Sequence, residues 1–318
     1  MSLNFLFIIH FSLFVFHLLM FLLETPKQFN LRRTLYSHGW SELAPFEIDD
    51  KNWRLSYVFT GAALKQPVSA TISQAGDADK LKIEASAGAK ISAKAQEKIL
   101  RDARHILRLD DDLNEFYKLV KAEKDLAWIA KNNAGRLVRS PTVFEDLVKT
   151  LCTTNCNWAM TKKMTSNLVE KLGAPAAGEG GKRAFPTAEA MAGQTVEFYK
   201  NEIRAGYRAL YFQELAENVA NGRLNPETWL DADLPAGELK KEMKRVKGVG
   251  DYAAENLLKL VGRYDGLALD SWLRAQFYKK HNAETVCDDK HIERHYERFG
   301  AWRGLVMWCD MTRRWLDD

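Results

Sequence analysis

Two glycines placed two residues apart, in the stretch VKGVGDYAAENLLKL at 246–260, constrain the fold of this chain more than any other feature. They separate two helical patterns, each with an apolar stripe, and the second pattern ends before Gly262. Glycine permits a sharp turn and removes side chains that would block a close approach to the backbone. The pattern therefore predicts a helical hairpin at 239–261, with free N–H groups at the start of its second helix.

The predicted turn suits an anion. Main-chain N–H groups at a helix N-terminus attract negative charge, and Lys247 and the basic residues before it add to the field. A phosphate of a nucleic-acid backbone fits such a site. A tight helical hairpin with a solvated lysine face fits the same residues, so the hairpin alone leaves both interpretations open.

The rest of the chain indicates an α+β fold. Three stretches alternate apolar and polar residues with period two, which predicts short antiparallel strands: WRLSYVFTG, PVSATIS and KLKIEAS. From about residue 94 the apolar residues recur at helical spacing. We therefore expect a small antiparallel β-rich domain at 29–93, followed by an all-helical body at 94–318. The net charge of +4 permits a nucleic-acid partner without requiring one.

An apolar run at 5–23 is long enough to cross a bilayer. It lacks the basic start and the small-residue cleavage site of a secretory signal. We interpret residues 1–23 as an apolar leader with three possible origins: a membrane anchor, an uncleaved signal-like segment, or a start codon assigned too early, with Met20 as the true start. The misassigned start is favoured over membrane anchoring, because nothing after Phe29 resembles a secreted or membrane-bound protein.

The four cysteines are interpreted as reduced thiols, since none forms the paired spacing of a zinc site. Cys152 and Cys156 lie four residues apart on a predicted helix, which favours packing over metal binding.

An aspartate follows the hairpin in the stretch LALDSWLR. Asp270 comes after an apolar segment and before a new helical pattern, where an aspartate commonly caps a helix. Its position after the hairpin also makes a chemical role possible.

The hairpin and Asp270, in this order, resemble the signature of the helix-hairpin-helix (HhH-GPD) DNA glycosylase superfamily. Two further stretches agree with it. FEDLVKTLCTTNCNWAMTKKMTSNLVEKLG is similar to the family segment that carries the residue wedged into the duplex, and AGYRALYF is similar to the helix opening before the hairpin. The resemblance runs from about residue 110 to 302. The β-rich segment before it is similar to the extra N-terminal domain of the 3-methyladenine glycosylase II and 8-oxoguanine glycosylase branches.

The resemblance implies an enzyme of base excision repair. Asp270 would stabilise an oxocarbenium-like sugar and orient or deprotonate the attacking water. Tyr252 and Trp272 would line the pocket of the flipped base, although a place in the core fits Trp272 equally well. We expect DNA contacts from the hairpin, from the wedge and from the helix start after Asp270: Lys247, Gly248, Val249, Gly250, Asn155, Ser271 and Arg274.

Tyr252 stands where bifunctional members of the family have a lysine that forms a Schiff base. The resemblance therefore implies a monofunctional glycosylase of the 3-methyladenine glycosylase II type, which hydrolyses the N-glycosidic bond of an alkylated purine. The wedge segment is more similar to the 8-oxoguanine branch, which leaves an 8-oxoguanine-type enzyme as one alternative. A non-catalytic DNA-binding hairpin module is the other.

The same resemblance implies double-stranded DNA with a damaged base as the partner, a monomer, and a DNA-containing compartment such as the cytoplasm or nucleoid. No cofactor is expected. An iron–sulfur cluster is not expected either, because no four-cysteine cluster follows the catalytic region. The hairpin backbone at Lys247, Val249 and Gly250 could hold Na⁺ or K⁺.

Overall fold

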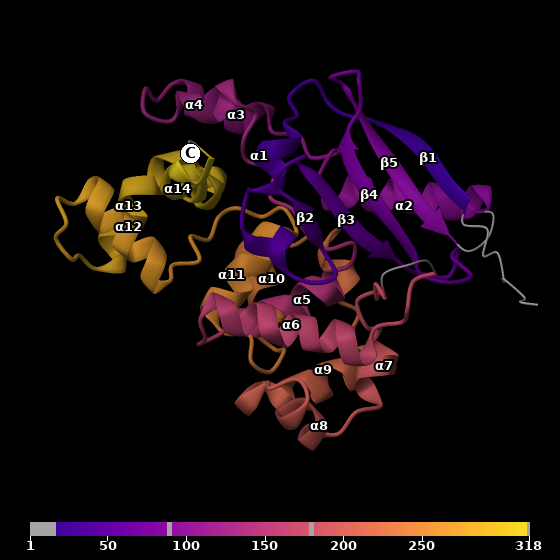
Figure 1. Cartoon of the computed structure of the whole chain (residues 1–318). Helices are drawn as coiled ribbons and strands as arrows, with labels where there is room; N and C mark the ends of the chain where they lie inside the picture. The colour runs from indigo at the N-terminus through magenta and orange to yellow at the C-terminus, as the bar shows by residue number, and fades with distance from the viewer. Residues whose placement is uncertain (1–16, 88–90, 178–180, 317–318) are drawn as a thin grey trace, which may run out of the picture.

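The computed structural model describes residues 17–87, 91–177 and 181–316. Its N-terminal part is an antiparallel sheet of five strands in the order β1-β5-β4-β3-β2 (Figure 1). The strands are β1 (His17–Glu24), β2 (Glu47–Asp49), β3 (Arg54–Phe59), β4 (Val68–Gln74) and β5 (Lys80–Ala87). The three strands predicted by alternation are β3, β4 and β5. The predicted α+β fold, a sheet followed by a helical body, is confirmed.

The edge strand β1 lies in the segment expected to be an apolar leader, and it pairs with β5 along its whole length. Phe21 and Leu23 are 9% and 5% exposed, because they pack into the core of the sheet. Met20 and Leu22, on the other face, are 64% and 56% exposed. Alternation is invisible in the sequence here, because both faces of the strand are apolar.

The expected end of the leader at residue 23 is therefore wrong, since residues 17–23 belong to the sheet. Residues 1–16 lie outside the described residues. Within the described part of the chain, no helix combines the length and the apolar character needed to cross a membrane.

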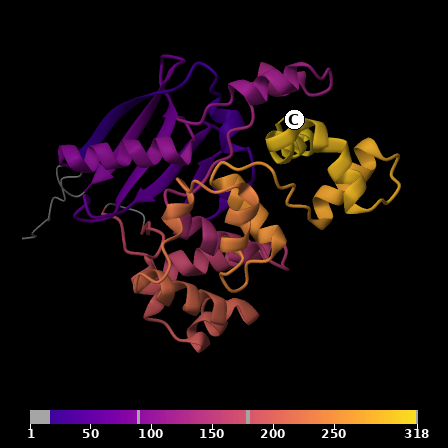
Figure 2. The same cartoon turned by 180° about the vertical axis from the view of Figure 1, so that it is seen from behind.

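Two helices complete the sheet unit. The short α1 (Leu31–Leu35) precedes β2, and α2 (Ala93–Ile106) lies across one face of the sheet (Figure 2). The Ser92 side chain caps α2 by accepting from the N–H of Ala95. Ile99 and Ile106 are fully buried in the same core as the strands. The expected boundary at residue 93 separates strands from helices in the sequence, but α2 packs with the strands.

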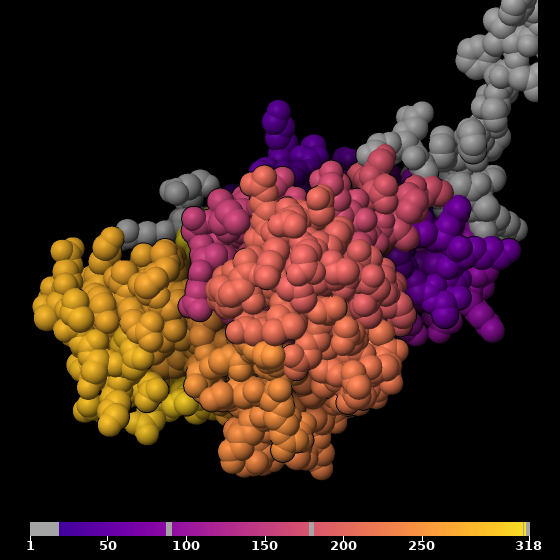
Figure 3. All heavy atoms as spheres, turned by 90° about the horizontal axis from the view of Figure 1, so that it is seen from below, coloured from indigo at the N-terminus to yellow at the C-terminus, as the bar shows by residue number. Residues whose placement is uncertain are grey.

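The remaining helices form two groups, each with its own core. The first group follows the sheet unit and includes the hairpin: α5 (Val143–Thr153), α6 (Trp158–Leu172), α7 (Ala188–Ala192), α8 (Val196–Asn201), α9 (Ala209–Ala220), α10 (Ala236–Met243) and α11 (Asp251–Leu260). The second group joins two earlier helices to the C-terminal ones: α3 (Asn114–Lys121), α4 (Ala127–Lys131), α12 (Ser271–His281), α13 (Asp289–Tyr296) and α14 (Arg303–Thr312). Figure 3 shows helices of the first group between the C-terminal helices and the sheet unit.

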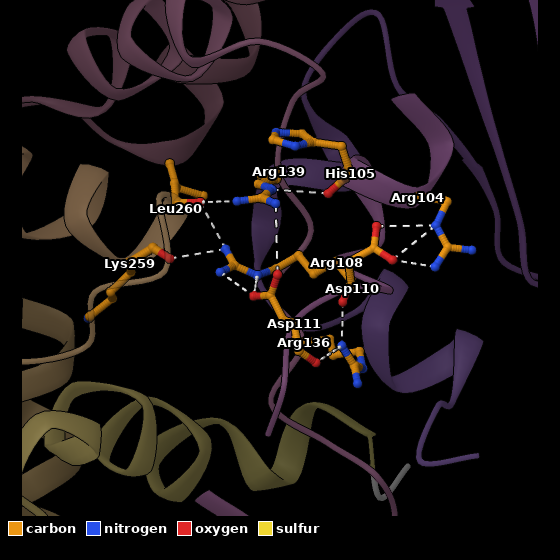
Figure 4. A network of polar contacts seen from close by, with 9 residues as sticks. All are labelled: Arg104, His105, Arg108, Asp110, Asp111, Arg136, Arg139, Lys259 and Leu260. Carbon is orange, nitrogen blue, oxygen red and sulfur yellow. Dashed lines mark hydrogen bonds and ion pairs between the residues drawn. The ribbon is translucent and has the colours of Figure 1, made fainter. Parts of the chain in front are cut away.

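Buried arginines join the segment after α2 to the C-terminus of α11 (Figure 4). Arg108, which is 1% exposed, donates from Nη1 to the carbonyl oxygens of Lys259 and Leu260 at 3.1 and 2.9 Å. Arg139 donates to the same oxygen of Leu260 at 3.1 Å, and Asp111 pairs with Arg108 at 2.6 Å. Helix C-terminal carbonyls carry partial negative charge, so the guanidinium groups are balanced by the helix end as well as by Asp111.

Candidate active site

The helical hairpin lies where the sequence predicts it, with α10 and α11 on either side of the turn. Its two glycines do different things. Gly248 has a φ of +90°, and a Cβ there would lie 2.4 Å from the Tyr211 ring, so the position requires glycine for both backbone and space. Gly250 is the N-cap of α11, and a Cβ there would meet no atom within 4 Å. Open space therefore lies beside the N-terminus of α11.

The lysines around the turn are paired with acids. Lys240 and Lys244 each lie 3.0 Å from Asp251, the first residue of α11. Hydrogen bonds from Lys244 and Lys240 lower the pKa of Asp251, and the bond from Lys244 has the larger effect on this pKa. Lys247 lies 3.1 Å from Glu214. The basic field expected at the turn is therefore partly neutralised, but exposed pairs of this kind are weak enough for a phosphate to replace the carboxylate.

The expected wedge residue lies in the turn between α5 and α6. Asn155 has a φ of +45°, a left-handed conformation that asparagine tolerates better than most residues, and its side chain is exposed. Its Nδ2 donates to the hydroxyl of Tyr207 at 3.1 Å. Tyr207 is 51% exposed and was not singled out from the sequence, although it lies in the stretch AGYRALYF. The pair forms a polar and aromatic projection beside the hairpin.

A cavity of about 550 Å³, called the groove here, connects the wedge turn, the hairpin turn and the start of α12. Its lining includes Asn155 and Tyr207, Gly248 and Gly250, and Asp270. The structure thus brings together three segments that lie far apart in the sequence.

Asp270 is the N-cap of α12, and its Oδ1 accepts from the N–H of Leu273 at 2.7 Å. Its other oxygen, Oδ2, accepts no hydrogen bond from the described residues. The half-buried carboxylate also lines a second cavity, of about 1200 Å³. The helix cap uses Oδ1 and leaves Oδ2 available for a role in the site. The two roles that the sequence leaves as alternatives are therefore compatible.

The second cavity, called the aromatic chamber here, has walls from the sheet unit and from α6, α11, α12 and α14. Tyr252 and Trp272 line it, as expected from the sequence. Trp272 also contacts the C-terminal helices, with its ring centroid 6.4 Å from that of Trp308. Sequence reasoning missed most of the aromatic lining: Trp40, Phe46, Trp158, Trp308 and Trp315.

Two titratable groups of the chamber are neutral near pH 7. Burial, with a smaller effect from the charge of Asp270, raises the pKa of Tyr252 to about 12. Burial lowers the pKa of His38 to about 4. His38 Nε2 lies 2.5 Å from the carbonyl oxygen of Val138, so Nε2 carries the proton and Nδ1 remains an acceptor.

The two other residues expected to bind DNA are placed differently. Ser271 is exposed and lines both cavities. Arg274 lines neither of them, and its guanidinium makes two hydrogen bonds of 2.8 Å with Asp289. A phosphate contact by Arg274 would have to compete with that carboxylate.

The cysteine pair on α5 and the following turn contributes packing. Cys152 is buried, and burial raises the pKa of its thiol to about 12. Cys156 donates to the carbonyl oxygen of Cys152. In the part of the chain that the structure describes, no group of three or more histidine, cysteine and acidic side chains is placed to hold a metal ion.

A sheet unit, a helical hairpin and an aspartate that lines two cavities together make up the candidate site. Residues 148–305 match the model of the HhH-GPD superfamily of base excision DNA repair proteins. The chain belongs to this superfamily.

Comparisons with individual proteins agree with this family. The chain is 24% identical over 170 residues to an N-glycosylase/DNA lyase of Saccharomyces cerevisiae, covering 50% of this chain and 45% of the relative. It is 26% identical over 165 residues to a DNA-3-methyladenine glycosylase of Bacillus subtilis, covering 51% and 54%. The match thus spans about half the length of these curated relatives. The solved 3-methyladenine DNA glycosylase of Archaeoglobus fulgidus has a similar fold, with a TM-score of 0.74, 18% identity, and coverage of 93% of this chain and 99% of that one.

Proposed function

We propose that the protein is a monofunctional DNA glycosylase of base excision repair, which hydrolyses the N-glycosidic bond of an alkylated purine in double-stranded DNA. The observation that carries the proposal is the position of Asp270, whose carboxylate lines both the groove beside the hairpin and the aromatic chamber. Duplex DNA on the groove would place a flipped base in the chamber, with its sugar beside this carboxylate.

The chemistry follows from that placement. A base within a duplex is inaccessible, so the enzyme extrudes the nucleotide at a cost of a few kcal/mol. As the glycosidic bond breaks, the sugar acquires positive charge, which the Asp270 carboxylate stabilises. Oδ2 is the oxygen that faces this task, because Oδ1 is committed to the helix cap. The same oxygen can orient or deprotonate the water that attacks the sugar.

The positions of the lysine side chains favour hydrolysis over a lyase reaction. Lys162 is the one lysine among the described residues that line the two cavities, and its Nζ lies 3.0 Å from Glu42. Lys247 lies on the outer side of the hairpin turn and lines neither cavity. Lys259 is buried and donates to the carbonyl oxygen of Leu267 at 2.9 Å. With Tyr252 beside Asp270, the described residues place no amine where it could form a Schiff base with the sugar.

The aromatic lining supports an alkylated purine as the substrate. Alkylation at a ring nitrogen gives the base a positive charge, which the faces of Trp272 and Tyr252 attract. An 8-oxoguanine-type glycosylase is the second candidate, because the segment around Asn155 is more similar to that branch.

One panel of duplex oligonucleotides tests these candidates. Each carries 7-methylguanine, 8-oxoguanine, uracil or no lesion, and excision is measured as strand breakage after alkali. We expect release of 7-methylguanine, with strands that stay intact until alkali is added. Release of 8-oxoguanine alone would favour the second candidate, and binding without any release would indicate a non-catalytic DNA-binding module.

We further propose that the hairpin turn holds Na⁺ or K⁺ when DNA is bound. The carbonyl oxygens of Lys247 and Val249 accept no hydrogen bond from the described residues, whereas that of Gly250 accepts from Ala254 at 2.9 Å. Two of the three carbonyls are thus available to an oxygen-seeking cation, which would link the hairpin to a phosphate. The protein would act as a monomer in a DNA-containing compartment.

A further inference from the structure

The aromatic chamber is larger than a purine needs. Its volume of about 1200 Å³ exceeds the range of about 300–1000 Å³ that is usual for pockets binding drug-sized molecules. Rings line one wall in an unbroken row, with neighbouring centroids 5.1 to 6.4 Å apart: Trp40, His38, Trp308, Trp272 and Trp315. A single base stacks on one or two such rings, so most of the row remains for another part of the ligand.

The chamber extends from Asp270 to the sheet unit. Near Asp270 its lining overlaps that of the groove, since Tyr252 and Ser271 line both cavities. Towards the sheet unit it is lined by Tyr36 and Phe46 and reaches exposed residues such as Asp50. A base held beside Asp270 therefore leaves this second half of the chamber unfilled.

Three of the five tryptophans that line the chamber are held by hydrogen bonds to other elements. Three indole N–H groups donate to partners on other elements: Trp40 to Asp146 at 2.7 Å, Trp308 to the carbonyl oxygen of Ser37 at 2.7 Å, and Trp158 to Glu42 at 3.2 Å. Gly39 lies against the Trp158 ring so closely that a Cβ would approach it to 2.3 Å. The indole N–H groups of these three tryptophans are thus already used, which leaves their ring faces for contact with a ligand. Ring faces of this kind bind apolar and aromatic groups.

We infer that the chamber accepts purines that carry a large apolar or aromatic N-alkyl group, with the base beside Asp270 and the substituent against Trp40 and Trp158. This inference rests on the proposed glycosylase function and adds the size of the lesion to it. A methyl group would leave the half of the chamber near the sheet unit unfilled, whereas a benzyl group would reach its rings.

Two matched duplexes test the inference, one with 7-methylguanine and one with 7-benzylguanine. The measured quantity is kcat/KM for excision, divided by the spontaneous depurination rate of the same duplex. We expect the corrected value for the benzyl lesion to equal or exceed that for the methyl lesion. A benzyl value tenfold or more below the methyl value would overturn the inference and leave the proposed function standing. Excision of neither lesion would reject the proposed function itself.

A variant pair locates the effect. Trp158→Ala should lower the benzyl-to-methyl ratio about tenfold, because the substituent loses an aromatic contact and the area buried with it. Trp53→Ala is the control, since Trp53 is 46% exposed and lies outside the chamber. If both variants change the ratio equally, the substituent does not occupy the chamber half that Trp158 lines, and the inference is wrong.

Discussion

Asp270→Asn should remove excision while leaving both the fold and DNA binding in place. Asparagine is nearly isosteric with aspartate and caps helices equally well, so its side-chain oxygen can keep the bond from the N–H of Leu273. We therefore expect the free energy of unfolding to change by less than about 0.5 kcal/mol. What the variant lacks is the negative charge that faces the sugar.

The magnitude follows from Coulomb's law. A carboxylate about 4 Å from a unit positive charge contributes about 4 kcal/mol at an effective dielectric constant of about 20. At about 1.4 kcal/mol per factor of ten, this corresponds to about a thousandfold in rate. Because Asp270 is half-buried and water screens part of its field, we expect a fall of at least about a hundredfold.

The assay is single-turnover excision of 7-methylguanine, with DNA affinity measured by fluorescence anisotropy and stability by thermal unfolding. Asp288→Asn is the matched control, because Asp288 caps α13 in the same way, accepting from the N–H of His291 at 2.9 Å, but lines neither cavity. Excision by Asp270→Asn at close to the wild-type rate would refute the reasoning. So would an equal loss in the control.

Three further predictions follow from the site. Gly250→Val should weaken binding to damaged and undamaged DNA alike by about tenfold or more in anisotropy titrations, because the new side chain would keep a phosphate from the N–H groups of α11. A loss of affinity confined to damaged DNA would instead place this turn in the base pocket. Borohydride should trap no covalent protein–DNA adduct, because Tyr252 supplies no amine, and efficient trapping on denaturing gels would contradict monofunctional chemistry. Between pH about 6.5 and about 4 the unfolded chain binds a proton at His38 that the folded protein does not, so this residue makes the free energy of unfolding fall as pH falls. In urea unfolding, His38→Gln should show a shallower fall of this free energy with pH than the wild type. The same dependence on pH in both proteins would contradict a neutral imidazole.

The parts of the fold that the sequence predicts are those with a local signal. The hairpin at 239–261 was predictable because glycine spacing and two helical stripes are contiguous, and Asp270 because a capping residue precedes its own helix. The strand β1 was missed for the opposite reason. Its inward and outward residues are both apolar, so the period of a strand was hidden within a run long enough for a membrane span.

The aromatic chamber has no local signal, because its walls come from distant parts of the chain. The bond from Trp40 to Asp146 spans 106 residues, and that from Trp308 to Ser37 spans 271. The sequence contains nine tryptophans, and nothing in their spacing indicates which of them meet. Arg274 shows that a local sequence signal can also favour a contact that depends on distant packing. Its place after Asp270 favoured a DNA contact, but its ion pair with Asp289 depends on how α13 packs.

Because buried arginines bond the segment after α2 to the end of α11, we expect these two parts to unfold together. A fragment that begins at α3 would lack Arg108, and the last carbonyl groups of the hairpin helix would lose their principal donor inside the protein. Conversely, unfolding of α11 alone would leave this guanidinium buried with Asp111 as its main remaining partner, a state that costs several kcal/mol. Partial unfolding that frees the hairpin while the sheet persists is thus suppressed, and amide exchange in α11 should follow global unfolding rather than local opening. The sheet, which contributes no residue to the hairpin, is in this sense part of what keeps the hairpin folded.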